Sequence, residues 1–125
     1  MFTTILRQIL AVFLLSSLLA PLGAMAQDWP NKPIRLVINF APGSSPDVLG
    51  RAVATPLSQA LGVPVVVDNR AGAGGNIGTA ALSKAQPDGY TLGVMTVSAM
   101  SIGPHIHKSL SFVPAKDFTP ITNIV

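Results

Sequence analysis

The hydrophobic residues of this chain fall into short, nearly unbroken runs separated by polar turns. The run at residues 34–40 has the length of a strand, and its lack of alternation predicts a parallel strand buried on both faces. A β-branched run at residues 65–67 predicts a second, short strand, and residues 90–97 predict a third. The chain therefore contains the strands of a buried sheet.

Between the first two strands, apolar residues recur at helical spacing. This helix is expected to begin near Pro46, with a serine before it as the N-cap and Asp47 in its first turn. Gly62, with Pro64 just beyond it, marks the end of the helix. Pro56 lies inside the helix and is expected to kink it.

A second helical stripe follows the second strand and is formed by Ile77, Ala81, Leu82 and Ala85. Residues 98–108 are expected to form a helical segment after the third strand. This segment should be less regular than the others because it contains a glycine and a proline. The order strand, helix, strand, helix, strand, helix predicts an α/β fold with a parallel sheet and right-handed crossovers.

Three connections follow the carboxyl ends of the predicted strands, at residues 41–47, 70–78 and 97–100. Open α/β sheets bind their ligands at this edge, so the three loops are the expected site. Residues 118–125 are again strand-like, but no helix follows them. So few elements would cover only part of their apolar surface, and we expect the chain to be an N-terminal piece of a longer protein.

The first residues have the pattern of a secretory signal peptide. One cation precedes an apolar run that is too short for a comfortable membrane span, and small residues surround Met25 in an A-x-A arrangement. We expect residues 1–26 to be removed by cleavage after Ala26. The chain has no cysteine, and an exported protein without disulfides fits the bacterial periplasm.

Several function classes are disfavoured by composition. The net charge is +3 and the cations are spread singly, so no nucleic-acid patch is present. His105 and His107 have no third ligand nearby, which argues against a metal site. The serines lie in no nucleophile elbow, and the aspartates have structural explanations, so no catalytic residues are assigned. We expect a protein that is not an enzyme and has no cofactor.

The most glycine-rich stretch, residues 69–78, leads from the second strand into the second helix. Such a loop is a plausible anion cradle, or it is only a tight turn that lets the helix pack closely; both explanations stay open. A dinucleotide fingerprint fails because Ile77 stands where the third glycine is needed, and no Gly-Lys-Ser/Thr of a P-loop follows. The expected loop scaffold consists of Arg70, Gly72, Gly74, Gly75, Asn76 and Gly78.

Five spaced motifs together resemble a known family. They are Trp-Pro-Asn-Lys-Pro-Ile-Arg-Leu-Val at 29–37, Phe-Ala-Pro-Gly at 40–43 with Asp47, the glycine stretch at 69–78, Pro-Asp-Gly-Tyr-Thr-Leu at 87–92 and Lys-Asp-Phe at 116–118. This set is similar to the tripartite tricarboxylate transporter substrate-binding proteins, also called the Bug family. One departure is Ser44, where the family often has a second glycine.

The resemblance implies a periplasmic solute-binding protein with a type II-like, two-domain fold, of which this chain is a truncated half. It would capture a small carboxylate (a di- or tricarboxylate, an acidic amino acid or a similar compound), deliver it to membrane transporter subunits, and be monomeric when complete. Residues 27–117 would belong to the first domain and 118–125 to a strand crossing toward the second. The implied ligand-binding residues are Phe40, Ala41, Pro42, Gly43, Ser44, Ser98 and Ala99.

Two other functions remain as alternatives. One is a Rossmann-like nucleotide-binding enzyme domain, which the glycine stretch suggests although its fingerprint is incomplete. The other is an exported structural domain that binds no small ligand. Binding of carboxylates or of nucleotides separates these possibilities.

Overall fold

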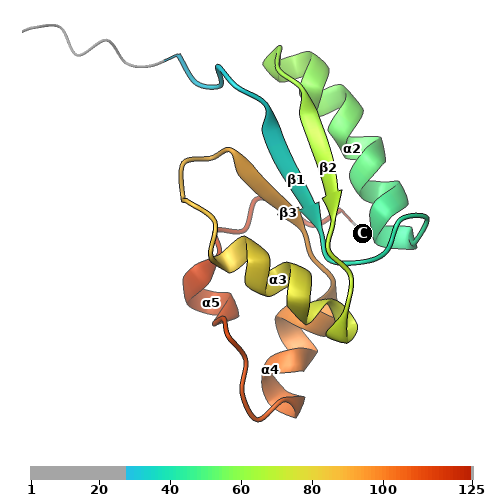
Figure 1. Cartoon of the computed structure of the whole chain (residues 1–125), viewed down its shortest axis with the longest axis vertical. Helices are drawn as coiled ribbons and strands as arrows, with labels where there is room; N and C mark the ends of the chain where they lie inside the picture. Colours follow the sequence, from blue (N-terminus) through green and yellow to red (C-terminus); the bar gives the residue numbers. More distant parts are fainter. Residues whose placement is uncertain (1–27, 125) are drawn as a thin grey trace, which may run out of the picture.

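The computed structural model describes residues 28–124, so the expected signal peptide and its cleavage site lie outside the described residues. Three parallel strands, β1 (Ile34–Ile38), β2 (Val65–Asn69) and β3 (Thr91–Val94), form one sheet in the order β2-β1-β3. The predicted parallel sheet is confirmed (Figure 1). The third strand is shorter than predicted, because the chain turns after Met95 and Thr96 accepts a hydrogen bond from Ala99.

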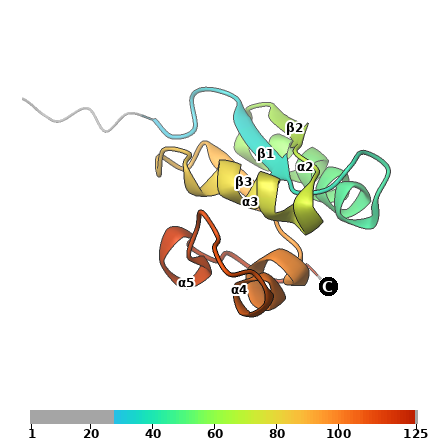
Figure 2. The same ribbon diagram turned by 60° about the horizontal axis from the view of Figure 1, so that its bottom comes forward.

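The two longer helices pack on opposite faces of this sheet (Figure 2). Helix α2 (Ser45–Leu61) approaches β1 so closely that a Cβ on Gly50 would lie 2.5 Å from Ile38 Cδ1. Helix α3 (Asn76–Ser83) covers the other face, where a Cβ on Gly93 would lie 2.4 Å from Leu82 Cδ2. Successive residues of β1 therefore face the two helices alternately, as the pleat of a strand requires.

The ends of α2 differ in detail from the predicted ones. Its N-cap is Ser44, one residue before the expected serine, and the Ser44 hydroxyl donates to the Ala41 carbonyl (2.6 Å) instead of capping the helix. At the other end, Gly62 adopts φ +69° and donates its N–H to Ser58, so the predicted glycine stop is confirmed. The helix continues as one element through Pro56.

The core is centred on β1, the middle strand. Ile34, Val37 and Ile38 are almost completely buried, with 0–1% of their surface exposed. This explains the nearly continuous apolar run that predicted the strand, since both faces of β1 are covered. Asn39, the next residue, is equally buried but polar.

After β3 the chain forms only short turns of helix. A π-helical turn η2 (Ser98–Ile102) continues into α4 (Gly103–Ile106), in agreement with the loose helical segment expected there. A further turn, α5 (Pro114–Asp117), was not predicted. The strand expected at 118–125 is not formed among residues 118–124, where Ile121 is 80% exposed and no neighbouring strand provides hydrogen bonds.

Within residues 28–124, no helix is both long and apolar enough to cross a bilayer.

Candidate functional site

Three loops lie together at the carboxyl edge of the sheet. The first loop (residues 40–44) follows β1, the glycine loop (residues 70–78) follows β2 and the third loop (residues 95–100) follows β3. Because the strands are parallel and β1 is central, their carboxyl ends meet on the same side (Figure 1). This confirms the convergence of the loops that the order of elements predicted.

The strand order also defines a topological switch point between β1 and β3. The chain leaves β1 for α2 on one face, and it leaves β3 for the short turns that precede and form α4, which lie on the side of α3 (Figure 2). Adjacent strands whose connections leave to opposite sides open a crevice between their following loops. The first and third loops flank this point, and they contain all the predicted ligand-binding residues.

The first loop exposes its backbone to solvent. Ala41, Pro42 and Gly43 are exposed, and Ser44 and Phe40 are half-buried. Gly43 adopts φ +81°, and a Cβ on it would meet no other atom within 4 Å. In the third loop Ser98 is exposed, whereas Ala99 is completely buried. The side chain of Ala99 thus contributes to packing beneath the loop.

The first loop is held in place by a buried carboxylate. Asp47, in the first turn of α2, accepts hydrogen bonds from the Gly43 N–H (2.8 Å) and from Arg51 Nε (3.0 Å). Asn69 at the end of β2 donates to the same carboxylate (2.9 Å) and to the Phe40 carbonyl (3.0 Å). The side chain of Asp47 therefore ties the first loop to both α2 and β2.

These contacts change the titration of Asp47. The hydrogen bond from Arg51, then those from Gly43 and Asn69, lower the pKa of this carboxyl from 3.8 to about 2. Asp47 is ionised at neutral pH, and its charge is compensated by the Arg51 guanidinium. A negative charge at the start of α2 also interacts favourably with the helix dipole.

The glycines of the glycine loop meet two different structural requirements. Gly72, Gly74 and Gly75 adopt positive φ angles of +128°, +64° and +97°, which residues with a Cβ rarely adopt. Gly78 is needed for space instead, because a Cβ there would lie 2.6 Å from the Arg70 carbonyl and 2.7 Å from Asn39 Cα. Asn76 is the first residue of α3.

Arg70 is engaged in a local ion pair. Its Nε donates to Asp68 Oδ2 (3.0 Å), and Arg35 on β1 donates to the same oxygen from Nε (2.8 Å) and Nη2. The two guanidinium groups, that of Arg35 first, hold the pKa of Asp68 below its usual value. In the structure Arg70 is thus paired locally with Asp68.

One buried residue at this edge was missed by the sequence interpretation. Asn39 is 0% exposed, and its Nδ2 donates to Thr79 on α3 and to Thr96 in the third loop, both at 3.3 Å. The available signal was an amide directly after a strand whose residues are apolar except for Arg35. A polar side chain buried there needs partners from neighbouring loops.

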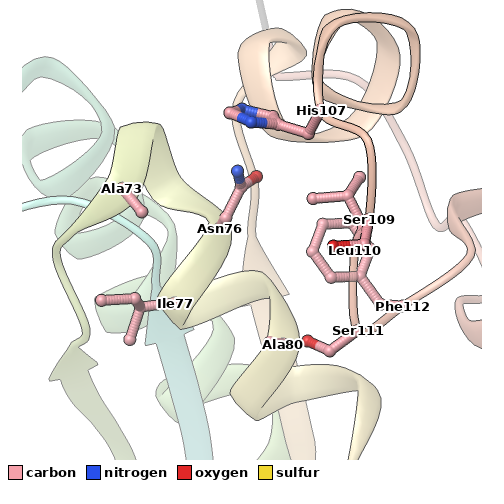
Figure 3. A pocket seen from close by; sticks show the side chains of 9 residues that line it. All are labelled: Ala73, Asn76, Ile77, Ala80, His107, Ser109, Leu110, Ser111 and Phe112. Carbon is pink, nitrogen blue, oxygen red and sulfur yellow. The ribbon is translucent and has the colours of Figure 1, made fainter.

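A separate groove of about 610 Å³ lies along the outer side of α3. Figure 3 shows Asn76 on α3 pointing toward His107, and Leu110 and Phe112 on the irregular segment that follows α4. No residue of the first loop lines this groove, so it is distinct from the crevice at the switch point.

No group of three or more histidine, cysteine or acidic side chains that could hold a metal ion occurs in the described part of the chain. His105 lies in α4 and His107 follows it, and both side chains are exposed.

Comparison with known proteins identifies the family. Residues 49–125 match the model of the tripartite tricarboxylate transporter family receptor, TctC. The chain belongs to this family. A UPF0065 protein of Bordetella bronchiseptica is 43% identical over 119 residues, which cover 95% of this chain and 35% of that protein. The chain thus spans about a third of the length of this curated relative.

Solved structures agree with the family assignment. A periplasmic transporter is 49% identical with a TM-score of 0.74, and the match covers 76% of this chain and 32% of that one. An R. palustris protein solved with adipate is 37% identical (TM-score 0.66), and MatC from Rhodopseudomonas palustris with bound malate is 32% identical (TM-score 0.70). Each of these two matches covers 74% of this chain and 31% of the other.

The predicted fold class and the resemblance to the Bug family are therefore confirmed, since the periplasmic binding protein BugD is also among the matching structures. The family is one of transporter receptors, so the expectation of a protein that is not an enzyme is confirmed as well.

Proposed function

We propose that this chain supplies the first-domain wall of a periplasmic receptor that captures a small di- or tricarboxylate, an acidic amino acid or a similar carboxylate. The observation that carries this proposal is the exposed first loop at the switch point between β1 and β3. Relatives solved with adipate and with malate support the ligand class. The family description supports delivery to membrane transporter subunits.

The charges around the site suggest how the carboxylate is held. Arg51 is paired with Asp47, and Arg35 and Arg70 are paired with Asp68, so each of the arginines next to the loops already has an acidic partner. We expect the ligand to bind instead to backbone N–H groups, to ordered water and to the N-terminal end of α2. Ser98 is the expected side-chain donor, since the Ser44 hydroxyl already donates to the Ala41 carbonyl.

In this proposal, residues 1–26 are a cleaved signal peptide that directs the protein to the periplasm. Residues 118–125 lead toward a second domain that closes over the first loop. Two relatives with solved structures are described as periplasmic, which supports the location.

The binding test uses a chimera in which residues 28–124 replace the matching third of MatC, so that the ligand site has both walls. We expect isothermal titration calorimetry to show saturable binding of at least one of malate, adipate, citrate and aspartate. Binding of ATP or NAD without any carboxylate would overturn the proposal in favour of a nucleotide-binding domain. Absence of binding to all these compounds by a folded chimera would favour an exported structural domain.

A matched pair of variants tests whether the first loop is the binding element. Gly43 and Gly62 lie at opposite ends of α2, both at positive φ and with open space for a side chain. Gly43→Val and Gly62→Val therefore introduce similar backbone strain. We expect only Gly43→Val to weaken carboxylate binding, by about tenfold or more, which is about 1.4 kcal/mol. Equal affinities in the two variants would remove the first loop from the site.

A further inference from the structure

The side chain of Asn39 connects all three loops at the carboxyl edge. It lies between the middle strand β1 and the first loop, and its Nδ2 donates to Thr79 Oγ1 on α3 and to Thr96 Oγ1 in the third loop. Thr79 passes the connection on, because its own hydroxyl donates to the Gly75 carbonyl in the glycine loop (2.9 Å). One buried amide thus links segments that are about 40 and 57 residues away in sequence.

The glycine loop is shaped to fit around this amide. A Cβ on Gly75 would lie 2.6 Å from Asn39 Nδ2, and a Cβ on Gly78 would lie 2.7 Å from Asn39 Cα and 2.9 Å from its Cβ. Two of the glycines that look like an anion cradle in the sequence therefore make room for a protein side chain.

Packing alone does not account for an amide at this position. Asn39 Oδ1 is buried and has no hydrogen-bond partner among residues 28–124. A buried acceptor without a partner destabilises the folded state, and an apolar side chain of similar size would avoid that cost. The two hydrogen bonds donated by Nδ2 are what the amide provides and leucine cannot.

We propose that Asn39 is a positioning residue that sets the third loop and the glycine loop relative to the first loop. The effect of Asn39 on ligand affinity rests on the proposed carboxylate function, whereas its effect on the positions of the loops does not. If the amide is removed, the third loop loses its side-chain hydrogen bond to residue 39. Helix α3 loses its hydrogen bond as well and keeps only its packing against residue 39. The crevice between the first and third loops then loses its fixed width.

Hydrogen exchange on the chain from residue 27 onward, the proposed mature form, tests the positioning directly. Asn39→Leu is expected to speed amide exchange about tenfold or more in both the glycine loop and the third loop. Thr96→Val keeps the shape of Thr96 but removes one acceptor, so only the third loop should exchange faster. Thr79→Val should affect only the glycine loop and the start of α3.

Ile34→Val is the matched control, since Ile34 is equally buried but lies at the opposite end of β1. It should raise exchange evenly across the protein without singling out a loop. If Asn39→Leu does not fold, the isosteric Thr96→Val and Thr79→Val still test the bridge. Evenly increased exchange in all variants, or no change in the two loops, would overturn the proposal.

Ligand affinity separates this inference from the proposed function. In the MatC chimera, Asn39→Leu is expected to raise the Kd of the bound carboxylate about tenfold, or about 1.4 kcal/mol, and Ile34→Val to leave it unchanged. Loop-selective exchange in the chain combined with a chimera that binds no carboxylate would contradict the proposed function and support the positioning role. Unchanged Kd and unchanged loop exchange in Asn39→Leu would contradict the positioning role alone.

Discussion

Side-chain interactions connect the strands and loops at both ends of the sheet, but they are of different kinds. At the amino end, Trp29 packs against Tyr90 with ring centroids 6.0 Å apart, and Lys32 lies 4.1 Å from the Tyr90 ring centroid. Lys32 also pairs with Asp88 (3.3 Å), and all of this lies near solvent. At the carboxyl end, the linking groups are Asn39 and Asp47, which are 0% and 3% exposed.

This difference determines how much each end depends on its individual groups. Water replaces a lost hydrogen bond or ion pair at the amino end, so each exposed interaction there contributes little. At the carboxyl end water is excluded, and removing one partner leaves another buried group unsatisfied. Substitutions at the carboxyl end should therefore lower the free energy of unfolding more, and they should also increase amide exchange in the loops that form the candidate site.

The largest effect is expected for Gly78→Ala, which tests the close packing at the carboxyl end. The new Cβ would lie 2.6 Å from a carbonyl oxygen and 2.7 Å from a Cα, both backbone atoms that cannot rotate away. Overpacking of this kind costs about 1–3 kcal/mol or more, whereas the gain in helix propensity is at most about 1 kcal/mol. We expect the free energy of unfolding in urea to fall by about 2 kcal/mol.

Gly74→Asn is the control within the same loop. Gly74 has φ +64° and open space, and asparagine tolerates that conformation. Its cost should be only a few tenths of a kcal/mol, the usual range for a surface substitution. If both substitutions lower the free energy of unfolding equally, the close packing of Gly78 against Asn39 does not contribute to stability. The glycines would then be required only for their backbone conformation.

A smaller but more local effect is expected for Asp47→Ala. The substitution leaves the Gly43 N–H and the Asn69 amide without their carboxylate, so the urea midpoint should fall and the amides of the first loop should exchange faster. Asp88→Ala removes an aspartate of the amino end, whose carboxylate accepts the Tyr90 N–H. That variant should have a urea midpoint close to that of the unaltered protein. Equal losses in the two variants would contradict the contrast between the two ends.

The fold was predictable because β1 is buried on both faces, and a strand buried in this way has a nearly continuous run of apolar residues. The same reasoning could not find the strand end at Val94, since Met95 and Val97 continue the apolar pattern while Thr96 already accepts a turn hydrogen bond. Residues 118–124 are likewise apolar enough for a strand, but a strand also needs a partner that the pattern does not show.

The convergence of the three loops at one edge of the sheet was predictable, but the hydrogen bonds that connect them were not. The alternation of strands and helices predicts a parallel sheet whose loops share one edge, but the strand order β2-β1-β3, which makes the first and third loops neighbours, is found only in the structure. The contacts of Asn39 and Asn69 span large sequence separations, and they depend on which loop atoms come within about 3 Å. Such geometry has no local signature, so the sequence left open whether the glycine loop is an anion cradle or a tight turn, and it did not show that the loop packs around the Asn39 side chain.

Acid should weaken the carboxyl end through Asp47. The pKa of Asp47 is lowered in the folded state, to about 2 from 3.8, so its contribution to stability is fully present above pH 3.8 and is lost as the pH falls toward 2. The midpoint of urea unfolding should decrease over that interval. The difference between the unaltered protein and Asp47→Ala should shrink there, which isolates Asp47 from Asp68, whose pKa is also lowered. A difference that is constant with pH would show that the carboxylate charge does not stabilise the loop.

The smallest effect is expected at the amino end, for Tyr90→Phe. The Tyr90 hydroxyl donates to Asn31 Oδ1 and accepts from the Asn31 N–H, both at 3.0 Å, while the ring contacts Trp29 and Lys32. Phenylalanine keeps the ring and removes only these bonds, whose groups water can reach, so the loss should be about 0.5 kcal/mol. Amide exchange in the first and third loops should not change. Faster exchange there would mean that the two ends of the sheet are coupled through β3, and the carboxyl edge could not then be treated as an independent site.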